Sequence, residues 1–173
     1  KPVVTDEIVA IRDLAIEAGG NPNCADRAQW LYIAAYIYMQ QGNYTQAKAL
    51  LSKAEKAPAS DYMKESIKVL SIYLDALTAT YNAAYEERLF EQIKWFEERV
   101  RLDFNSDDYD YCMWHDFSEN YWYSSMTRIL SYTVAPRYLE MGNPARALQL
   151  MNFADYLPYK YVTSIDYYVD NDY

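Results

Sequence analysis

One stretch of this chain occurs twice, and it constrains the fold more than any other feature. Residues 35–58 and 135–158 share eight identities over twenty-four positions at a constant offset. The shared residues of the first copy are Ala35, Tyr38, Gly42, Asn43, Ala47, Leu50, Ala54 and Pro58. Those of the second are Ala135, Tyr138, Gly142, Asn143, Ala147, Leu150, Ala154 and Pro158. This agreement predicts two copies of one structural unit.

Each copy predicts two helices joined by a very short turn. Gly42 suits the left-handed residue that ends a helix, because glycine adopts positive φ without a Cβ clash. Asn43 then suits the N-cap of a second helix, its side-chain oxygen accepting from an unpaired backbone amide. Pro58 bars extension of that helix. The second helix carries an apolar stripe at helical spacing: Ala47, Leu50, Leu51 and Ala54.

This spacing of small, aromatic and glycine residues resembles the tetratricopeptide repeat. The matching positions are Ala35, Tyr38, Gly42, Tyr44, Ala47, Leu51 and Ala54 in the first copy, and Ala135, Tyr138, Gly142, Ala147, Met151 and Ala154 in the second. Leu31 and Ala34 depart from the family pattern, which has tryptophan and leucine there. The resemblance implies antiparallel helical hairpins stacked into a right-handed α-α superhelix, a tetratricopeptide-like solenoid.

The rest of the chain also has helical periodicity. We predict an all-α protein of about seven helices, forming a single helical-repeat domain over 1–173 with clear repeats at 26–58 and 118–158. The expected helices span 4–18, 26–41, 44–56, 60–80, 85–102, 118–141, 144–157 and the apolar pattern after 160. Pro136 should kink or split its helix near Val134.

The first of these helices has clear start and stop signals. Thr5 suits its N-cap, and Gly19 with Gly20 should end it. The expected buried stripe consists of Ile8, Ile11, Leu14 and Ala15.

Charge and composition exclude several classes of function. A formal charge of −9 and a pI near 4.6 argue against nucleic acid and anionic bilayers as partners. The longest apolar run, 30–39, is too short for a transmembrane segment. The chain begins at Lys1 without methionine, which favours a mature or excised domain. Its twenty tyrosines resemble the composition of cell-envelope proteins, so we expect a periplasmic or envelope location.

Residues 103–117 form an acidic, aromatic segment that we expect to be a loop. Asp103, Asn105 and Asp107 occupy positions 1, 3 and 5 of a twelve-residue calcium loop. Asp108 replaces the glycine needed for the sharp turn, and Trp114 replaces the bidentate acid. The pattern therefore predicts a solvated acidic loop and no bound metal.

Cysteine and histidine support no catalytic site. Cys112 and His115 are close in sequence, but no second Cys/His pair completes a zinc site, and such neighbours rarely form a nucleophilic dyad. Cys24 and Cys112 could be bridged or could be buried thiols. No phosphate loop, dinucleotide fingerprint or nucleophile elbow occurs. We predict a non-enzyme without cofactors.

The remaining candidates are aromatic binding residues. Seven aromatics lie within 109–123, where tyrosine and tryptophan suit protein contacts or sugar stacking, or simply pack between helices. A first-helix face containing Asp26, Gln29, Tyr32, Tyr36 and Gln40 is the expected contact surface. The candidate binding residues are Tyr32, Tyr36, Tyr109, Tyr111, Trp114, Tyr121 and Trp122. The hypothesis is a scaffold that binds a protein or peptide. The alternative is a carbohydrate-binding envelope protein similar to the starch-utilisation outer-membrane lipoproteins.

Overall fold

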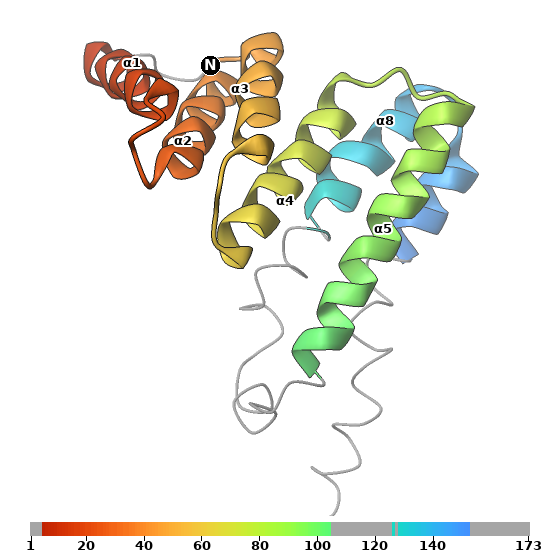
Figure 1. The fold of residues 1–173 in the computed structure, drawn as a ribbon. Coiled ribbons are helices and arrows are strands. Elements are labelled where there is room, and N and C mark those ends of the chain that lie inside the picture. The colour runs from red at the N-terminus through yellow and green to blue at the C-terminus, as the bar shows by residue number, and fades with distance from the viewer. Residues whose placement is uncertain (1–4, 105–125, 127, 153–173) are drawn as a thin grey trace, which may run out of the picture. The chain divides into compact units, whose positions relative to one another are not determined.

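The described part of the chain consists of helices joined by turns and loops, without a strand. The computed structural model describes residues 5–104, 126 and 128–152. Their elements are α1 (Asp6–Gly20), α2 (Arg27–Gln40), α3 (Tyr44–Lys56), α4 (Asp61–Thr78), α5 (Ala83–Phe104), the π-helix η2 (Ile129–Val134) and α8 (Ala135–Glu140) (Figure 1). A further helical stretch covers 144–152. The all-α prediction is confirmed.

The chain divides into two compact units, Lys1–Thr78 and Ala79–Tyr173. Each unit contains one copy of the repeated stretch, and each is described below by itself. The single repeat domain stays a prediction.

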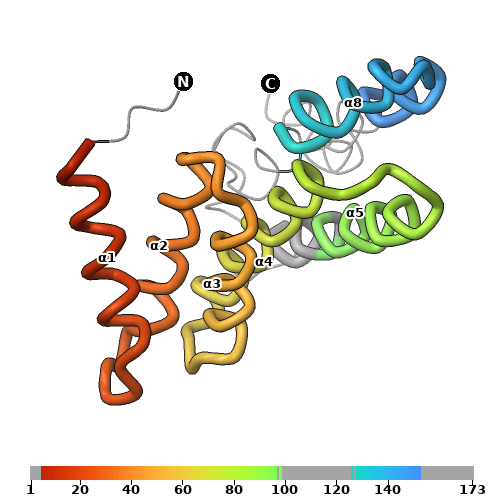
Figure 2. The backbone as a smooth tube through the Cα atoms, turned by 90° about the horizontal axis from the view of Figure 1, so that it is seen from above, coloured from red at the N-terminus to blue at the C-terminus, as the bar shows by residue number. Residues whose placement is uncertain are grey.

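In the first unit, four successive helices lie side by side (Figure 2). The α2 helix contacts α1 and α3, and α4 contacts both α3 and α2. The small residues Ala35, Ala47 and Ala54 are almost completely buried, which lets the helices of the α2–α3 pair approach closely. The predicted stripe of α3 is buried throughout, as expected from its spacing.

The turn of the first copy has the predicted geometry. Gly42 has φ 77°, and its N–H donates to the Met39 carbonyl at 2.9 Å. The Asn43 N–H donates to the Tyr38 carbonyl at 2.8 Å, which completes a Schellman motif. The Asn43 Oδ1 accepts from the Gln46 N–H at 3.3 Å and thereby caps α3.

The second copy, in the other unit, repeats this geometry. Gly142 has φ 78° and donates to the Leu139 carbonyl at 3.0 Å. Asn143 donates to the Tyr138 carbonyl at 2.8 Å and caps the next helix by accepting from the Arg146 N–H at 3.1 Å. The turn and cap predicted from the repeat are therefore confirmed in both copies.

The first helix departs from the prediction in two respects. Thr5 caps it as expected, by accepting from the Ile8 N–H at 3.3 Å. However, α1 continues through both glycines. A Cβ on Gly19 would lie 2.6 Å from Cγ of Leu31, so glycine at this position allows α2 to pack closely against α1. The predicted buried stripe is confirmed at Ala15 but is wrong at Ile11 and Leu14, which are 50% and 65% exposed. Gly19, which the stripe did not include, is buried together with Ala15.

Helix α4 begins at Asp61, next to its expected start at 60, whereas α5 begins at Ala83, two residues before its expected start at 85. Ser60 Oγ accepts from the Met63 N–H at 3.2 Å, and Asn82 Oδ1 accepts from the Tyr85 N–H at 3.0 Å. In α5 Leu89, Ile93 and Phe96 recur at helical spacing and are buried. The opposite side of the helix is charged and exposed, and consists of Glu87, Glu91, Lys94 and Glu98.

The α5 helix extends to Phe104, so Asp103, the expected first residue of the acidic loop, is helical. The loop was predicted from the acidic and aromatic composition of the segment, and composition alone does not end a helix. Residues 105–117 of that loop lie outside the described residues.

Pro136 produces the local change that its position predicts. Proline has no N–H for an α-helical bond to Tyr132, and its ring would clash with that carbonyl. The preceding residues form η2, and the Ala135 N–H donates five residues back to the Leu130 carbonyl. The geometry returns to α at Ala135, next to the predicted break at Val134.

Aromatic and ionic contacts hold the second unit together. Tyr81 stacks on Tyr85 with ring centroids 4.4 Å apart and lies 5.2 Å from the Tyr138 ring. Arg146, on the stretch 144–152, forms an ion pair with Glu86 of α5.

Candidate functional site

The strongest candidate surface lies on α2. In most surface helices one side is apolar and the other polar, but α2 carries apolar residues on all sides. Its inner side is buried against α1 and α3 and consists of Ala28, Leu31, Ala34, Ala35 and Met39. Its outer side would ordinarily be polar in a helix of this kind. Instead it carries two exposed aromatic side chains and two half-buried isoleucines.

Two aromatic residues dominate this outer side. Trp30 is 39% exposed and Tyr36 is 44% exposed. Ile33 and Ile37 are half-buried and lie three and seven residues after Trp30, so the three share one flank of the helix. We call Trp30, Ile33, Tyr36 and Ile37 the α2 face.

Polar residues border the α2 face. Gln29 and Gln40 are exposed at either end of it, and Asp26 is exposed at the N-cap position. An apolar centre with a polar border is the usual composition of a protein interface. Four of the five predicted contact residues are therefore exposed to solvent: Asp26, Gln29, Tyr36 and Gln40.

The other predicted binding residues have different positions. Tyr32 is half-buried and packs against the core of the first unit, so only part of its ring faces solvent beside Tyr36. Tyr109, Tyr111, Trp114, Tyr121 and Trp122 lie outside the described residues. Trp30 was missed, although its spacing to Ile33 and Ile37 is visible in the sequence. This apolar spacing beside the predicted contact residues of the same helix would have indicated it.

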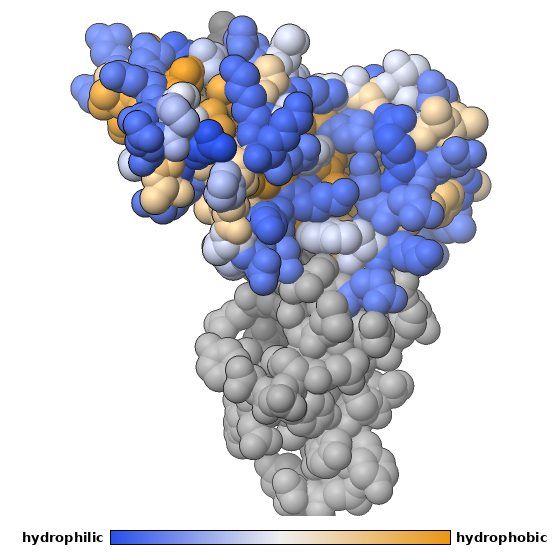
Figure 3. Space-filling model, viewed as in Figure 1, coloured by the Kyte–Doolittle hydropathy of each residue, from blue (hydrophilic) through white to orange (hydrophobic). Residues whose placement is uncertain are grey.

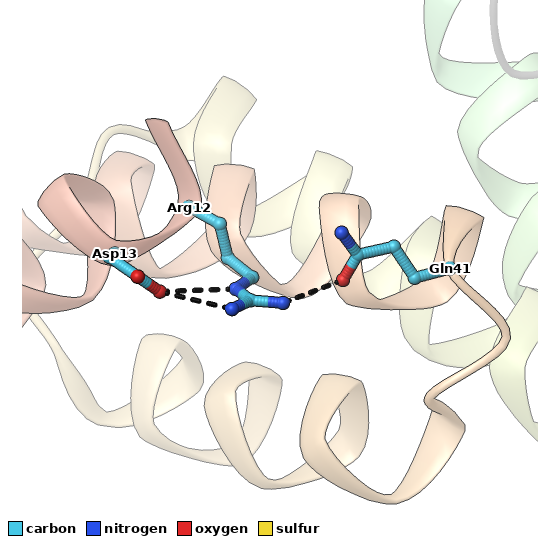
Figure 4. Close-up of polar contacts among 3 residues, drawn as sticks. All are labelled: Arg12, Asp13 and Gln41. Carbon is cyan, nitrogen blue, oxygen red and sulfur yellow. Dashed lines mark hydrogen bonds and ion pairs between the residues drawn. The ribbon is translucent and has the colours of Figure 1, made fainter. Parts of the chain in front are cut away.

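A polar cluster fixes α1 against the end of α2 (Figure 4). Arg12 Nη1 donates to Gln41 Oε1 at 2.8 Å, and Arg12 Nε and Nη2 donate to Asp13 Oδ1 at 3.2 Å. The guanidinium also lies 4.6 Å from the centroid of the Tyr38 ring, which is within cation–π distance. In Figure 4 each side-chain nitrogen of Arg12 is joined by a dashed line to Asp13 or Gln41. The cluster is therefore a structural clamp between helices.

Glu7 and Tyr138 have shifted pKa values. Backbone and Thr5 hydrogen bonds at the start of α1 lower the pKa of Glu7, which favours its charged form. In the second unit, burial and the neighbouring Tyr81 raise the pKa of Tyr138. The Tyr138 hydroxyl is buried and has no hydrogen-bond partner among the described residues. Neither group lies in a cluster with the chemistry of a catalytic site.

Metal and thiol chemistry find no support where the structure is described. Among residues 5–104, 126 and 128–152, no group of three or more His, Cys, Asp or Glu side chains could hold a metal ion. Cys24 is a free, half-buried thiol, while Cys112 and His115 lie outside this part of the chain. No helix in the same ranges has the length and apolarity to cross a membrane. No protein-family model matches the chain, and no curated protein or solved structure matches it.

Proposed function

We propose that this protein is a non-enzymatic helical-repeat scaffold that binds a protein or peptide through the α2 face. The observation that carries the proposal is the apolar outer side of a helix whose inner side is already buried. Exposed apolar residues on one element, bordered by polar side chains, are typical of surfaces that another molecule covers. Trp30 and Tyr36 are the residue types that contribute most to protein interfaces.

The arrangement of the first unit supports a tetratricopeptide-like stack. The α4 helix contacts both helices of the preceding hairpin, as expected when a further hairpin stacks on the first. The two copies also share their turn geometry hydrogen bond by hydrogen bond. In such a stack the first helices of the hairpins form one continuous surface, and α2 is a first helix. This supports a right-handed α-α superhelix as the proposed architecture.

Aromatic side chains make this surface suited to polypeptides. Tyrosine and tryptophan bury a large area at a small cost in side-chain entropy. Gln29 and Gln40 can each donate a hydrogen bond to a peptide carbonyl and accept one from a peptide N–H. The absence of charge on the α2 face itself favours a partner with an apolar contact region.

The test is capture of a partner by the purified chain and by single variants of it. Tyr36→Ala is expected to weaken capture at least tenfold, because it removes an exposed ring that the fold does not need. Tyr62→Ala, which changes an exposed tyrosine on α4, is the matched control and should leave capture unchanged. Equal capture by both variants would reject the α2 face. Heat in a calorimetric titration with an oligosaccharide panel, without any protein partner, would favour the carbohydrate alternative instead.

A further inference from the structure

The α1 helix carries a second apolar stripe that the fold leaves open. Ile11 and Leu14 are largely exposed, and Ala18 follows at helical spacing. The stripe lies on a different side of α1 from Ala15 and Gly19, which pack toward α2. In Figure 3, hydrophobic side chains reach the surface at the α1 end of the first unit. Two separate apolar sides on one helix indicate two packing partners.

Within the described residues, the α1 helix lacks the second neighbouring helix that α3 has. The α3 helix has α2 on one side and α4 on another, and its apolar residues are buried between them. The α1 helix packs extensively against α2 alone within the described residues. In a stack of helices, an end helix without a further neighbour normally presents a polar outer side. The exposed Ile11 and Leu14 do not fit that role.

Charges at both ends of the stripe specify the chemistry of a partner. Glu7 lies one turn before Ile11, and Glu17 lies one turn after Leu14; both side chains are exposed. Glu7 is favourable at the positive end of the helix dipole, but Glu17 lies near the negative end, where a carboxylate is unfavourable. No basic residue in the last turn offsets it. Arg12, the single cation of α1, is engaged by Asp13, Gln41 and Tyr38.

We propose that the outer side of α1 is a docking surface for an amphipathic helix of a partner protein with Lys or Arg at the borders of its apolar stripe. The apolar residues of the partner pack on Ile11 and Leu14, and its cations pair with Glu7 and Glu17. A second copy of this chain fits poorly, since α1 carries four carboxylates, Asp6, Glu7, Asp13 and Glu17, against one guanidinium. This surface is separate from the α2 face and does not depend on the function proposed for it.

The experiment uses a synthetic helical peptide about as long as α1, with a leucine stripe bordered by lysines and a fluorescent label. Fluorescence anisotropy with the full chain is expected to show binding that weakens as salt rises, because the pairs are exposed. Leu14→Asp should weaken binding about tenfold or more, and Glu17→Lys should weaken it several-fold. Leu148→Asp, a change at an equally exposed leucine elsewhere, is the matched control and should have no effect. Tyr36→Ala should also leave binding unchanged, which separates this surface from the α2 face.

Three results would overturn the proposal. The first is no binding of the lysine-bordered peptide, and the second is equal binding of the same peptide with glutamates in place of lysines. The third is self-association of the chain in sedimentation equilibrium that Leu14→Asp abolishes, which would assign the surface to a second copy. Circular dichroism of each variant checks that α1 remains folded. If Leu14→Asp loses helix, Ile11→Asp replaces it with the same expected outcome.

Discussion

The Asn43 N–H donates to the Tyr38 carbonyl at 2.8 Å, and the same bond recurs between Asn143 and Tyr138 at 2.8 Å. In both copies a glycine in the left-handed region precedes the asparagine, whose side chain caps the following helix. One asparagine therefore closes the end of one helix with its backbone and starts the next with its side chain. This double role explains why the connection between the two helices is so short.

The glycine of each turn is required for its backbone conformation alone. A Cβ at Gly42 or Gly142 would meet no atom within 4 Å, so alanine brings strain without a clash. Gly42→Ala and Gly142→Ala should each lower the free energy of unfolding by about 1–2 kcal/mol, the cost of left-handed backbone for a residue with Cβ. Urea unfolding measures both. Gly42→Asn should cost less, because asparagine tolerates this conformation better. A larger loss with asparagine than with alanine would contradict the assignment.

The two glycines at the end of α1 should respond in opposite directions. Gly19→Ala is expected to destabilise the protein by roughly 1–3 kcal/mol, because the added methyl group overlaps buried Leu31. Gly20→Ala places its methyl group in open space on a helix and should stabilise the protein by about 0.5 kcal/mol. Thermal unfolding of the two variants gives the comparison. Equal effects would mean that α1 and α2 do not pack as closely as the structure has them.

The contact between Arg12 and Gln41 should be measurable as a coupling energy. Arg12→Met keeps much of the apolar stem but loses the hydrogen bond to Gln41 and the stacking on Tyr38, and should cost about 1–2 kcal/mol. Gln41→Met introduces the residue found at this position in the second copy, Met141. A double-mutant cycle should give a coupling of about 0.5–1.5 kcal/mol. Asp13→Asn is the control and should cost less than about 0.5 kcal/mol, since Asp13 is well exposed. A coupling near zero would contradict the clamp.

Tyr138 should make the protein less stable at alkaline pH. Burial, followed by the influence of Tyr81, raises the pKa of Tyr138 above its ordinary value. In the unfolded chain the phenol loses its proton near pH 10, whereas the folded protein keeps it to higher pH. Its contribution to stability is therefore complete below pH 10 and is lost as the pH rises through the folded pKa.

Tyr138→Phe tests this account. The variant removes a buried hydroxyl that has no hydrogen-bond partner within the described part of the chain, and should raise the free energy of unfolding at neutral pH by about 1 kcal/mol. Its advantage over the wild type should grow above pH 10. Tyr132→Phe, at a fully solvated position, should change stability by less than about 0.5 kcal/mol. If Tyr138→Phe were less stable than the wild type at neutral pH, the Tyr138 hydroxyl would have to form a stabilising hydrogen bond, which would contradict this account.

Local chemistry made much of the fold predictable. Ser60 and both repeat asparagines start helices at the expected positions, because a cap depends on residues within one turn of it. The cap at Asn82 was not predicted, and α5 begins two residues earlier than expected. Pro136 disturbs its helix for an equally local reason. Gly19 shows where prediction from local sequence fails. Glycine is a helix-ending signal in isolation, but contact with Leu31 on another helix requires glycine inside α1.

Burial was less predictable because it depends on neighbours that the pattern does not identify. Ile11 and Leu14 fit a helical stripe as well as Ala15 does, yet the fold covers only the side with Ala15. Equivalent positions of the repeat differ for the same reason: Met39 is 8% exposed and Leu139 is 60% exposed. On the α2 face, Tyr36 was expected from its position on a first helix. Trp30 was not expected, because the apolar run 30–39 was considered only as a possible transmembrane segment.

Site-specific photocrosslinking on α2 tests the central claim most directly. A benzophenone side chain at position 36 is compared with the same group at position 62, an exposed tyrosine on α4, with the captured partner present. The proposed function predicts that position 36 forms a covalent adduct with the partner polypeptide and that position 62 forms little or none. Equal labelling at the two positions, or labelling at position 62 alone, would contradict a binding surface on the outer side of α2.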